Sequence, residues 1–172
     1  VQGYEWLVFM REQRFGACLA DDMGLGKTIQ MITYLLHTFE QIGAEKPALV
    51  ICPTSVLGNW QKEIEKFAPS LRVHSHYSGS RLKDAAFSAH VKETKPHVIL
   101  STYGTVTQDI EFLQEQSFST VVLDEAQNIK NMQTMQSRSI RKLSGDHHIA
   151  LTGTPVENRL AELWAIFDFI HK

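Results

Sequence analysis

The chain has few cysteines, no long apolar run and no basic leader segment. Its two cysteines, Cys18 and Cys52, lie in apolar runs that predict strands, where a small buried thiol is the ordinary explanation. No apolar run approaches the ~20 residues that span a bilayer, and the amino terminus lacks a basic segment followed by an apolar stretch. These absences argue against a reactive thiol and a membrane span, and we expect a soluble intracellular protein.

An excess of charge of one sign is also absent. Lys and Arg number 17 against 19 Asp and Glu, which gives a net charge of −2. Because no strong positive field points to nucleic acid, the charge counts against a DNA or RNA binder that works alone. Apolar residues at 43% and charged residues at 21% are close to globular averages, which excludes a disordered or fibrous chain. At 172 residues the chain is most simply one domain with a substantial core.

Apolar runs and helical patterns alternate from end to end. This alternation is typical of the α/β class, with a mainly parallel central sheet and helices on both faces. We expect strands at 17–20, 47–52, 71–76, 97–100, 119–123 and 148–151. We expect helices at 27–41, 56–67, 80–93 with Ser80 as its N-cap, 110–113, 134–143 and 160–170.

A glycine-bearing loop follows the first predicted strand, where residues 21–28 read DDMGLGKT. Gly24 and Gly26 let the backbone approach a phosphate, so that the amides of the loop can donate to it. Lys27 would meet the β- and γ-phosphates, and Thr28 would offer its hydroxyl to Mg²⁺ at the positive end of a helix dipole. The predicted nucleotide-binding residues are Asp21, Asp22, Met23, Gly24, Leu25, Gly26, Lys27 and Thr28.

The match to the common phosphate-loop formula is partial. Strict spacing puts Asp21 where the first glycine is usual. The missing glycine argues against a nucleoside kinase or a GTPase and favours a motor ATPase with a shortened glycine pattern. The alternative is a chance Gly-Lys-Thr, which the preceding apolar strand makes the weaker explanation.

Polar residues follow five of the predicted strands. In a parallel sheet the ligand site lies beyond the carboxyl ends of the strands, so these residues are expected to converge. Asp124 and Glu125 form an acidic pair at one strand end, which suits phosphoryl transfer to water: Asp124 is predicted to hold Mg²⁺ and Glu125 to position the water. Alone, the pair is better explained as acidic residues at a helix start, but together with the loop the catalytic interpretation is favoured. The strand-end segments are Asp21-Asp22, Pro53-Thr54-Ser55, Ser101-Thr102-Tyr103, Asp124-Glu125-Ala126-Gln127 and Thr152-Gly153-Thr154-Pro155.

Five segments resemble the successive motifs of Swi/Snf-type ATPases in helicase superfamily two. They read DDMGLGKT, CPTSVLGNWQKEIEKF, LSTYGT, VVLDEAQNIKN and ALTGTPVENRLAELWAIFDFI and cover nearly the whole chain. The resemblance implies that residues 1–172 are a single amino-terminal RecA-like lobe, with the three-layer fold of P-loop NTPases. It also implies ATP and Mg²⁺ as cofactors, the backbone of double-stranded DNA and a second RecA-like lobe of the parent chain as partners, and a cytoplasmic, nucleoid-associated or nuclear location.

The resemblance assigns further roles to individual residues. It makes Lys27, Asp124, Glu125 and Gln127 the catalytic set. Gln127 stands where many relatives have histidine and would link the γ-phosphate site to the coupling residues; glutamine can hydrogen-bond but cannot titrate near neutral pH. ATPase activity should survive this difference. The implied coupling residues are Thr152, Gly153 and Thr154, and the implied contacts to the DNA backbone are Thr54, Ser55, Thr102 and Tyr103.

Two other functions stay open at this point. Because the family's arginine finger and the other half of its DNA track belong to the second lobe, we expect residues 1–172 alone to hydrolyse ATP negligibly. A nucleotide-responsive interaction module without turnover is therefore the main alternative. A phosphate-loop kinase would need a lid and an acceptor pocket that the sequence does not reveal.

Two histidine pairs raise the question of a metal site. The spacing of His74 and His76 puts both imidazoles on one face of a strand, but no cysteine or third histidine lies nearby in the sequence. A solvated strand face is the favoured interpretation. His147 and His148, on opposite faces of a strand start, make no better zinc site.

Overall fold

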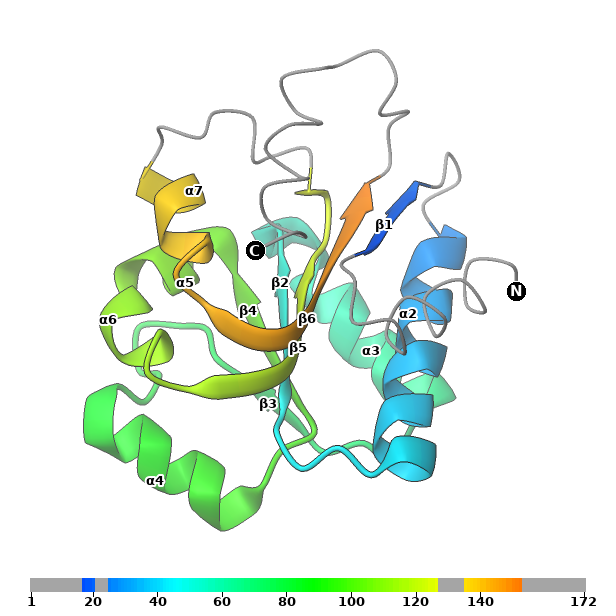
Figure 1. Ribbon diagram of the computed structural model, residues 1–172, viewed down its shortest axis with the longest axis horizontal. Helices are drawn as coiled ribbons and strands as arrows, with labels where there is room; N and C mark the ends of the chain where they lie inside the picture. Colours follow the sequence, from blue (N-terminus) through cyan, green and yellow to red (C-terminus); the bar gives the residue numbers. More distant parts are fainter. Residues whose placement is uncertain (1–16, 21–24, 127–134, 153–172) are drawn as a thin grey trace.

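Six parallel strands form one sheet between two layers of helices (Figure 1). The computed structural model describes residues 17–20, 25–126 and 135–152. The strand order is β1-β6-β5-β2-β4-β3, and every adjacent pair is parallel. The strands are β1 (Ala17–Ala20), β2 (Ala48–Cys52), β3 (Val73–Ser75), β4 (Val98–Thr102), β5 (Ser117–Leu123) and β6 (Ser144–Thr152). The helices are α2 (Leu25–His37), α3 (Leu57–Phe67), α4 (Asp84–Thr94), α5 (Tyr103–Gln108), α6 (Ile110–Leu113) and α7 (Met135–Ile140).

The central strands are buried on both faces because apolar side chains follow one another without polar alternation. Every residue of β2 and of β4 is buried. In β2, Leu49 and Ile51 join one apolar cluster, whereas Ala48, Val50 and Cys52 join a second cluster on the opposite face. This is the pattern of a parallel strand covered by helices on both sides.

The two clusters correspond to the two helical layers (Figure 1). Helices α2 and α3 cover one face, and α3 contributes a buried stripe of Leu57, Trp60 and Ile64 at helical spacing. Helices α4, α5, α6 and α7 lie against the other face, where Phe87 and Val106 are fully buried. Because helices start where parallel strands end, both layers deliver helix starts to the same edge of the sheet.

The predicted α/β class is confirmed, and most predicted elements agree with the observed ones within a few residues. Helix α2 ends earlier than expected and is followed by a π-helical turn, η1 (Thr38–Ile42), closed by Gly43 at φ +77°, a conformation that favours glycine. Helix α5 was not predicted. The expected terminal helix at 160–170 lies outside the described residues.

The predicted helix start at Ser80 is wrong. Helix α4 begins at Asp84 and Lys83 occupies the N-cap position. The Ser80 hydroxyl instead lies 3.2 Å from that of Ser78, within a loop tied down by Arg81, whose guanidinium donates to the Ser78 carbonyl. A cap was inferred from residue type alone, and the anchored loop moves the helix start by several residues. Within the described part of the chain, no helix has the length and apolarity needed to cross a membrane.

Candidate functional site

The carboxyl ends of the strands share one edge of the sheet, as required for the predicted convergence. Strand β1 ends at Ala20 and α2 begins at Leu25, while β5 ends at Leu123, directly before the acidic pair. A single strand, β6, separates β1 from β5. Two strand spacings amount to about 10 Å, which is the scale of a metal-bound triphosphate. The end of β1, the start of α2 and the end of β5 therefore lie at the same edge of the sheet (Figure 1).

The phosphate-loop prediction falls partly outside the described residues. Asp21, Asp22, Met23 and Gly24 lie there, and for Leu25, Gly26 and Lys27 the structure describes the helical backbone only. Thr28 stands in the first turn of α2 and is 8% exposed. The first turn of α2 therefore opens at the edge of the sheet where the prediction needs it.

Asp124 is held by four hydrogen bonds. Its backbone amide donates to the Ile51 carbonyl at 2.8 Å, and its own carbonyl accepts the Tyr103 hydroxyl at 2.5 Å. Carboxylate Oδ2 accepts the indole N–H of Trp60 at 2.8 Å, and Oδ1 accepts the amide of Glu125 at 2.9 Å. At 4% exposure, this carboxylate is buried, and the indole of Trp60 and the amide of Glu125 fix its direction.

Glu125 has an uncommon backbone conformation. Its φ is +52°, in the left-handed region that side chains other than glycine and asparagine rarely adopt. Such a conformation costs about 1–3 kcal/mol and persists only where the surroundings impose it. The turn that follows β5 therefore has a fixed backbone, which carries the buried Asp124 and the half-buried Glu125.

The four hydroxyl residues predicted to contact DNA fall into two groups. Thr54 and Ser55 are exposed and form the 3₁₀ turn η2 (Thr54–Val56) before α3. Thr102 and Tyr103 are 3% and 5% exposed, respectively. The Thr102 hydroxyl caps α5 by accepting the amide of Thr105 and donates to the Thr105 hydroxyl, while Tyr103 donates to Asp124. The hydroxyls of Thr102 and Tyr103 therefore form hydrogen bonds within the protein.

Two neighbours of Asp124 are kept in their protonated form. Burial, and then the charge of Asp124, raise the pKa of the Cys52 thiol to about 12. The same two causes raise the pKa of Tyr103 well above its usual range. Cys52 is therefore the inert buried thiol that the sequence predicted, and Tyr103 is a permanent donor at neutral pH.

A second buried carboxylate, Asp109, was missed by the sequence analysis. Its Oδ2 lies 2.7 Å from Nε2 of His76 and 2.6 Å from Nε of Arg81, and Oδ1 lies 3.0 Å from another Arg81 nitrogen. Burial raises the pKa of Asp109, but the hydrogen bonds and charges of Arg81 and His76 outweigh it and hold that pKa below its ordinary value. The partners lie 28 and 33 residues away in the sequence, so no local pattern could have revealed the network.

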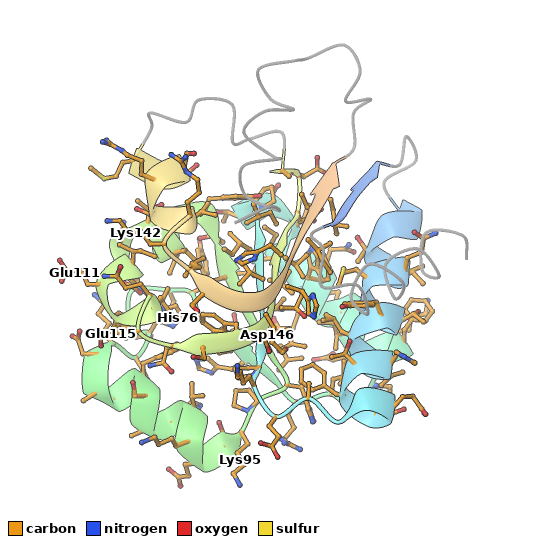
Figure 2. All side chains as sticks on the ribbon, viewed as in Figure 1. His76, Lys95, Glu111, Glu115, Lys142 and Asp146 are labelled. Carbon is orange, nitrogen blue, oxygen red and sulfur yellow. The ribbon has the colours of Figure 1, made fainter. Side chains whose placement is uncertain are left out.

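The predicted solvated face of β3 is wrong for His76, which is fully buried between α4 and the sheet (Figure 2). Burial lowers its pKa, although the hydrogen bond to Asp109 works in the opposite direction. The His74 ring lies 6.3 Å from that of His76, which agrees with the predicted shared face. No group of three or more potential metal ligands occurs among residues 17–20, 25–126 and 135–152.

The predicted coupling segment reaches only the margin of the described structure. Thr152 closes β6 and pairs with Ala20 of β1, so its backbone adjoins the strand that precedes the predicted phosphate loop. Gln127, Gly153 and Thr154 lie outside the described residues. His147 and His148 lie within β6 and are each 9% exposed, so both are packed inside the fold.

The comparison with protein families gives a match over the whole chain. The family described as the SNF2-related domain matches residues 1–172. YwqA of Bacillus subtilis, which is provisionally named an ATP-dependent helicase/translocase, is 58% identical over 170 residues. The match covers 99% of this chain and 18% of the relative. The chromatin-remodeling ATPase INO80 of Aspergillus oryzae is 37% identical over 177 residues, which cover 99% of this chain and 12% of that protein.

Solved structures show the same likeness. The SWI2/SNF2 ATPase core of Sulfolobus solfataricus in complex with double-stranded DNA superposes with a TM-score of 0.86 at 41% identity. That match covers 98% of this chain and 34% of the other. The likeness confirms the expected RecA-like arrangement. The chain therefore spans 18% of the length of YwqA and 34% of that of the archaeal core.

Proposed function

We propose that this chain, which belongs to the SNF2-related domain family, is the ATP-binding lobe of a DNA-dependent ATPase that moves along double-stranded DNA. The observation that carries the proposal is the shared sheet edge, where the start of α2 and the Asp124-Glu125 turn are separated by one strand. The names of YwqA and INO80 and the DNA complex of the archaeal core support the same function.

In this proposal, the phosphate loop binds ATP. The backbone amides around Gly24 and Gly26 donate to phosphate oxygens, and Lys27 contacts the β- and γ-phosphates. The amino end of α2 adds its partial positive charge. The remaining loop residues, Asp21, Asp22, Met23 and Leu25, shape this turn.

Thr28 and Asp124 are the proposed magnesium residues. Both offer oxygen donors, which Mg²⁺ prefers, and the Asp124 carboxylate is held in one direction by Trp60 and Glu125. When bound, the ion would neutralise charge on the phosphate oxygens. The residues present therefore fit the ion that the family resemblance implies.

Glu125 is the proposed residue that positions the attacking water and accepts its proton. Its left-handed backbone, at φ +52°, belongs to the turn whose amide donates to the Asp124 carboxylate, so the two acidic residues are held in one fixed turn. Proton transfer to a positioned carboxylate typically contributes 10²–10⁴-fold to the rate. Gln127 is proposed to link the γ-phosphate site, by hydrogen bonds, to the coupling residues Thr152, Gly153 and Thr154.

The DNA backbone is proposed to contact the exposed hydroxyls of Thr54 and Ser55. Hydroxyls and helix starts are suitable partners for phosphate without regard to sequence. Since the hydroxyls of Thr102 and Tyr103 are engaged within the protein, we propose that their segment supports the track while Thr54 and Ser55 touch it. Translocation is proposed only for the full-length protein, where a second lobe of the parent chain would supply the arginine finger and the other half of the DNA track.

The test is steady-state ATPase activity of the full-length protein with and without duplex DNA. Lys27→Ala is expected to abolish the DNA-stimulated rate, whereas Lys62→Ala, an exposed lysine on α3, is expected to leave it unchanged. An unchanged rate in Lys27→Ala would refute the proposal. The competing interaction module predicts nucleotide binding with no turnover in the wild type, and then Glu125→Gln would have no rate to remove.

Two further expectations remain predictions. Residues 1–172 alone should hydrolyse ATP negligibly, which steady-state ATPase with excess duplex DNA tests directly. The location of the protein, cytoplasmic and nucleoid-associated or nuclear, follows from the proposed DNA substrate and is tested by imaging a tagged full-length protein.

A further inference from the structure

Asp124 accepts hydrogen bonds from residues of both helical layers. The indole of Trp60 reaches its carboxylate from the α2-α3 face, where Trp60 is 1% exposed and belongs to the apolar cluster of that face. The hydroxyl of Tyr103 reaches its backbone carbonyl from the opposite cluster, which α5 shares with α4, α6 and α7. One donor therefore aims the side chain, and the other fixes the backbone that carries it.

Both donors are fixed in chemical state as well as in position. An indole N–H can only donate, and burial raises the pKa of Tyr103 so far that its hydroxyl keeps its proton at any physiological pH. Tightly packed side chains transmit displacement because the core leaves them little room to adjust. A small movement of either helix start would thus change the direction of the Asp124 carboxylate.

Each donor also lies at or near a segment of the proposed DNA track: Thr54 and Ser55 are proposed to touch DNA, and the segment of Thr102 and Tyr103 is proposed to support that contact. The turn η2, which carries Thr54 and Ser55, runs without a break into α3, whose fourth residue is Trp60. Tyr103 is the first residue of α5 and directly follows Thr102. The two helices that begin at the proposed DNA track are therefore the two that hold the proposed magnesium carboxylate.

We infer that Trp60 and Tyr103 are positioning residues that connect the DNA-facing helix starts to the Asp124 carboxylate, so that DNA binding and Mg²⁺-nucleotide binding strengthen each other. This inference rests on the proposed function. Thermodynamic linkage makes the effect reciprocal: if DNA lowers the Mg²⁺ concentration needed to bind nucleotide, Mg²⁺-nucleotide raises the affinity for DNA by the same factor.

The experiment measures equilibrium binding of a fluorescent ATP analogue to the full-length protein over a series of Mg²⁺ concentrations, with and without duplex DNA. Trp60→Phe keeps an aromatic ring in the core but removes the donor to Asp124. Ile64→Val is the matched control, because Ile64 lies one turn further along α3, is 1% exposed and belongs to the same cluster. Asp124→Asn tests whether the carboxylate is involved at all.

We expect Trp60→Phe to raise the Mg²⁺ concentration for half-maximal binding by roughly tenfold, the scale seen when a residue that orients a metal ligand is removed. The shift caused by DNA should shrink in the same variant. Ile64→Val should change neither quantity by more than about twofold. Tyr103→Phe, which removes a single oxygen, should act in the same direction as Trp60→Phe and provides an independent test should that variant fail to fold.

Two results would overturn the inference in distinguishable ways. If Asp124→Asn responds to Mg²⁺ like the wild type, the proposed metal site is wrong and the inference falls with it. If Asp124→Asn loses its Mg²⁺ response while Trp60→Phe and Tyr103→Phe match Ile64→Val, the proposed function stands and the two aromatic residues only fill the core.

Discussion

Two buried aspartates, Asp124 and Asp109, are held in different ways. Asp109 is 5% exposed and is paired with the guanidinium of Arg81 and the imidazole of His76. Asp124 is 4% exposed and is fixed by an indole N–H and a backbone amide, which are neutral donors. The ion pair with Arg81 ties Asp109 to the loop before α4, whereas the Trp60 indole and the Glu125 amide set the direction of the Asp124 carboxylate at the end of β5. Asp109 therefore has a structural role, and Asp124 is placed for the proposed catalytic one.

The largest effect is expected from removing the charge at the candidate site. Asp124→Asn and Glu125→Gln should each lower the DNA-stimulated ATPase rate on the order of 10³-fold, because they remove the proposed metal ligand and the proposed base. Glu125→Gln should hardly change the melting temperature. Asp124→Asn should lower it modestly, because the single amide oxygen can take the place of only one of the two oxygens that accept from Trp60 and from the Glu125 amide. Turnover assays paired with thermal unfolding of the same preparations check both halves of this prediction.

Removing the charge at Asp109 should have the opposite outcome. Asp109→Asn leaves the half-buried Arg81 guanidinium without its carboxylate, which should lower the free energy of unfolding by about 2 kcal/mol. ATPase activity per folded molecule should stay near the wild-type value. Urea unfolding measures the loss, with Asp146→Asn as the control, because Asp146 belongs to an exposed ion pair with Lys46 and should cost little (Figure 2). Equal losses of stability in Asp109→Asn and Asp146→Asn would show that the Asp109 network stabilises the fold no more than an exposed ion pair does.

A smaller effect is expected from pH, and it should trace to the Asp109 network. Burial lowers the pKa of His76 below 6.5. Just below this pH, His76 is therefore protonated in the unfolded chain but stays neutral in the folded protein. The free energy of unfolding should therefore fall as the pH drops from about 6.5 toward the pKa of His76 in the folded protein. The contribution of His76 to this fall is at most ~1.4 kcal/mol per pH unit. The lowered pKa of Asp109 works in the same direction at lower pH.

The variant His76→Gln checks this sign. Glutamine keeps a donor for Asp109 but cannot titrate, so the slope of stability against pH should become shallower between pH 7 and 5. His74 and His97 also have lowered pKa values through burial and will retain part of the slope. A slope identical to that of the wild type would show that His76 does not titrate differently on folding.

The sequence predicted the α/β fold and the shared edge at the carboxyl ends of the strands, because both follow from local patterns. Continuous apolar runs identify parallel strands, and polar residues after each strand mark the carboxyl edge. The direction of side chains at that edge could not be predicted. Thr102 and Tyr103 lie at the end of β4, in register with the end of β2 that precedes Thr54 and Ser55, yet α5 starts at once and the hydroxyls of Thr102 and Tyr103 bond within the protein.

Long-range pairing was the other feature that the sequence could not reveal. His76 looked like one of two histidines on a strand face, and its partner Asp109 lies 33 residues later in a segment without a motif. The bond from Trp60 to Asp124 spans 64 residues. Contacts of this kind depend on the strand order, which brings β5 next to β2 and the start of α3, and strand order is not encoded in local periodicity.

The central claim is that the loop before α2 and the Asp124-Glu125 turn bind one metal-nucleotide complex. The most direct measurement is a crystal structure of the full-length protein with Mn²⁺ and a non-hydrolysable ATP analogue, in which anomalous scattering locates the ion. The account predicts an anomalous peak within bonding distance of the Thr28 hydroxyl or the Asp124 carboxylate, or of water held between them. Nucleotide bound at another edge of the sheet, with the ion remote from both residues, would contradict it.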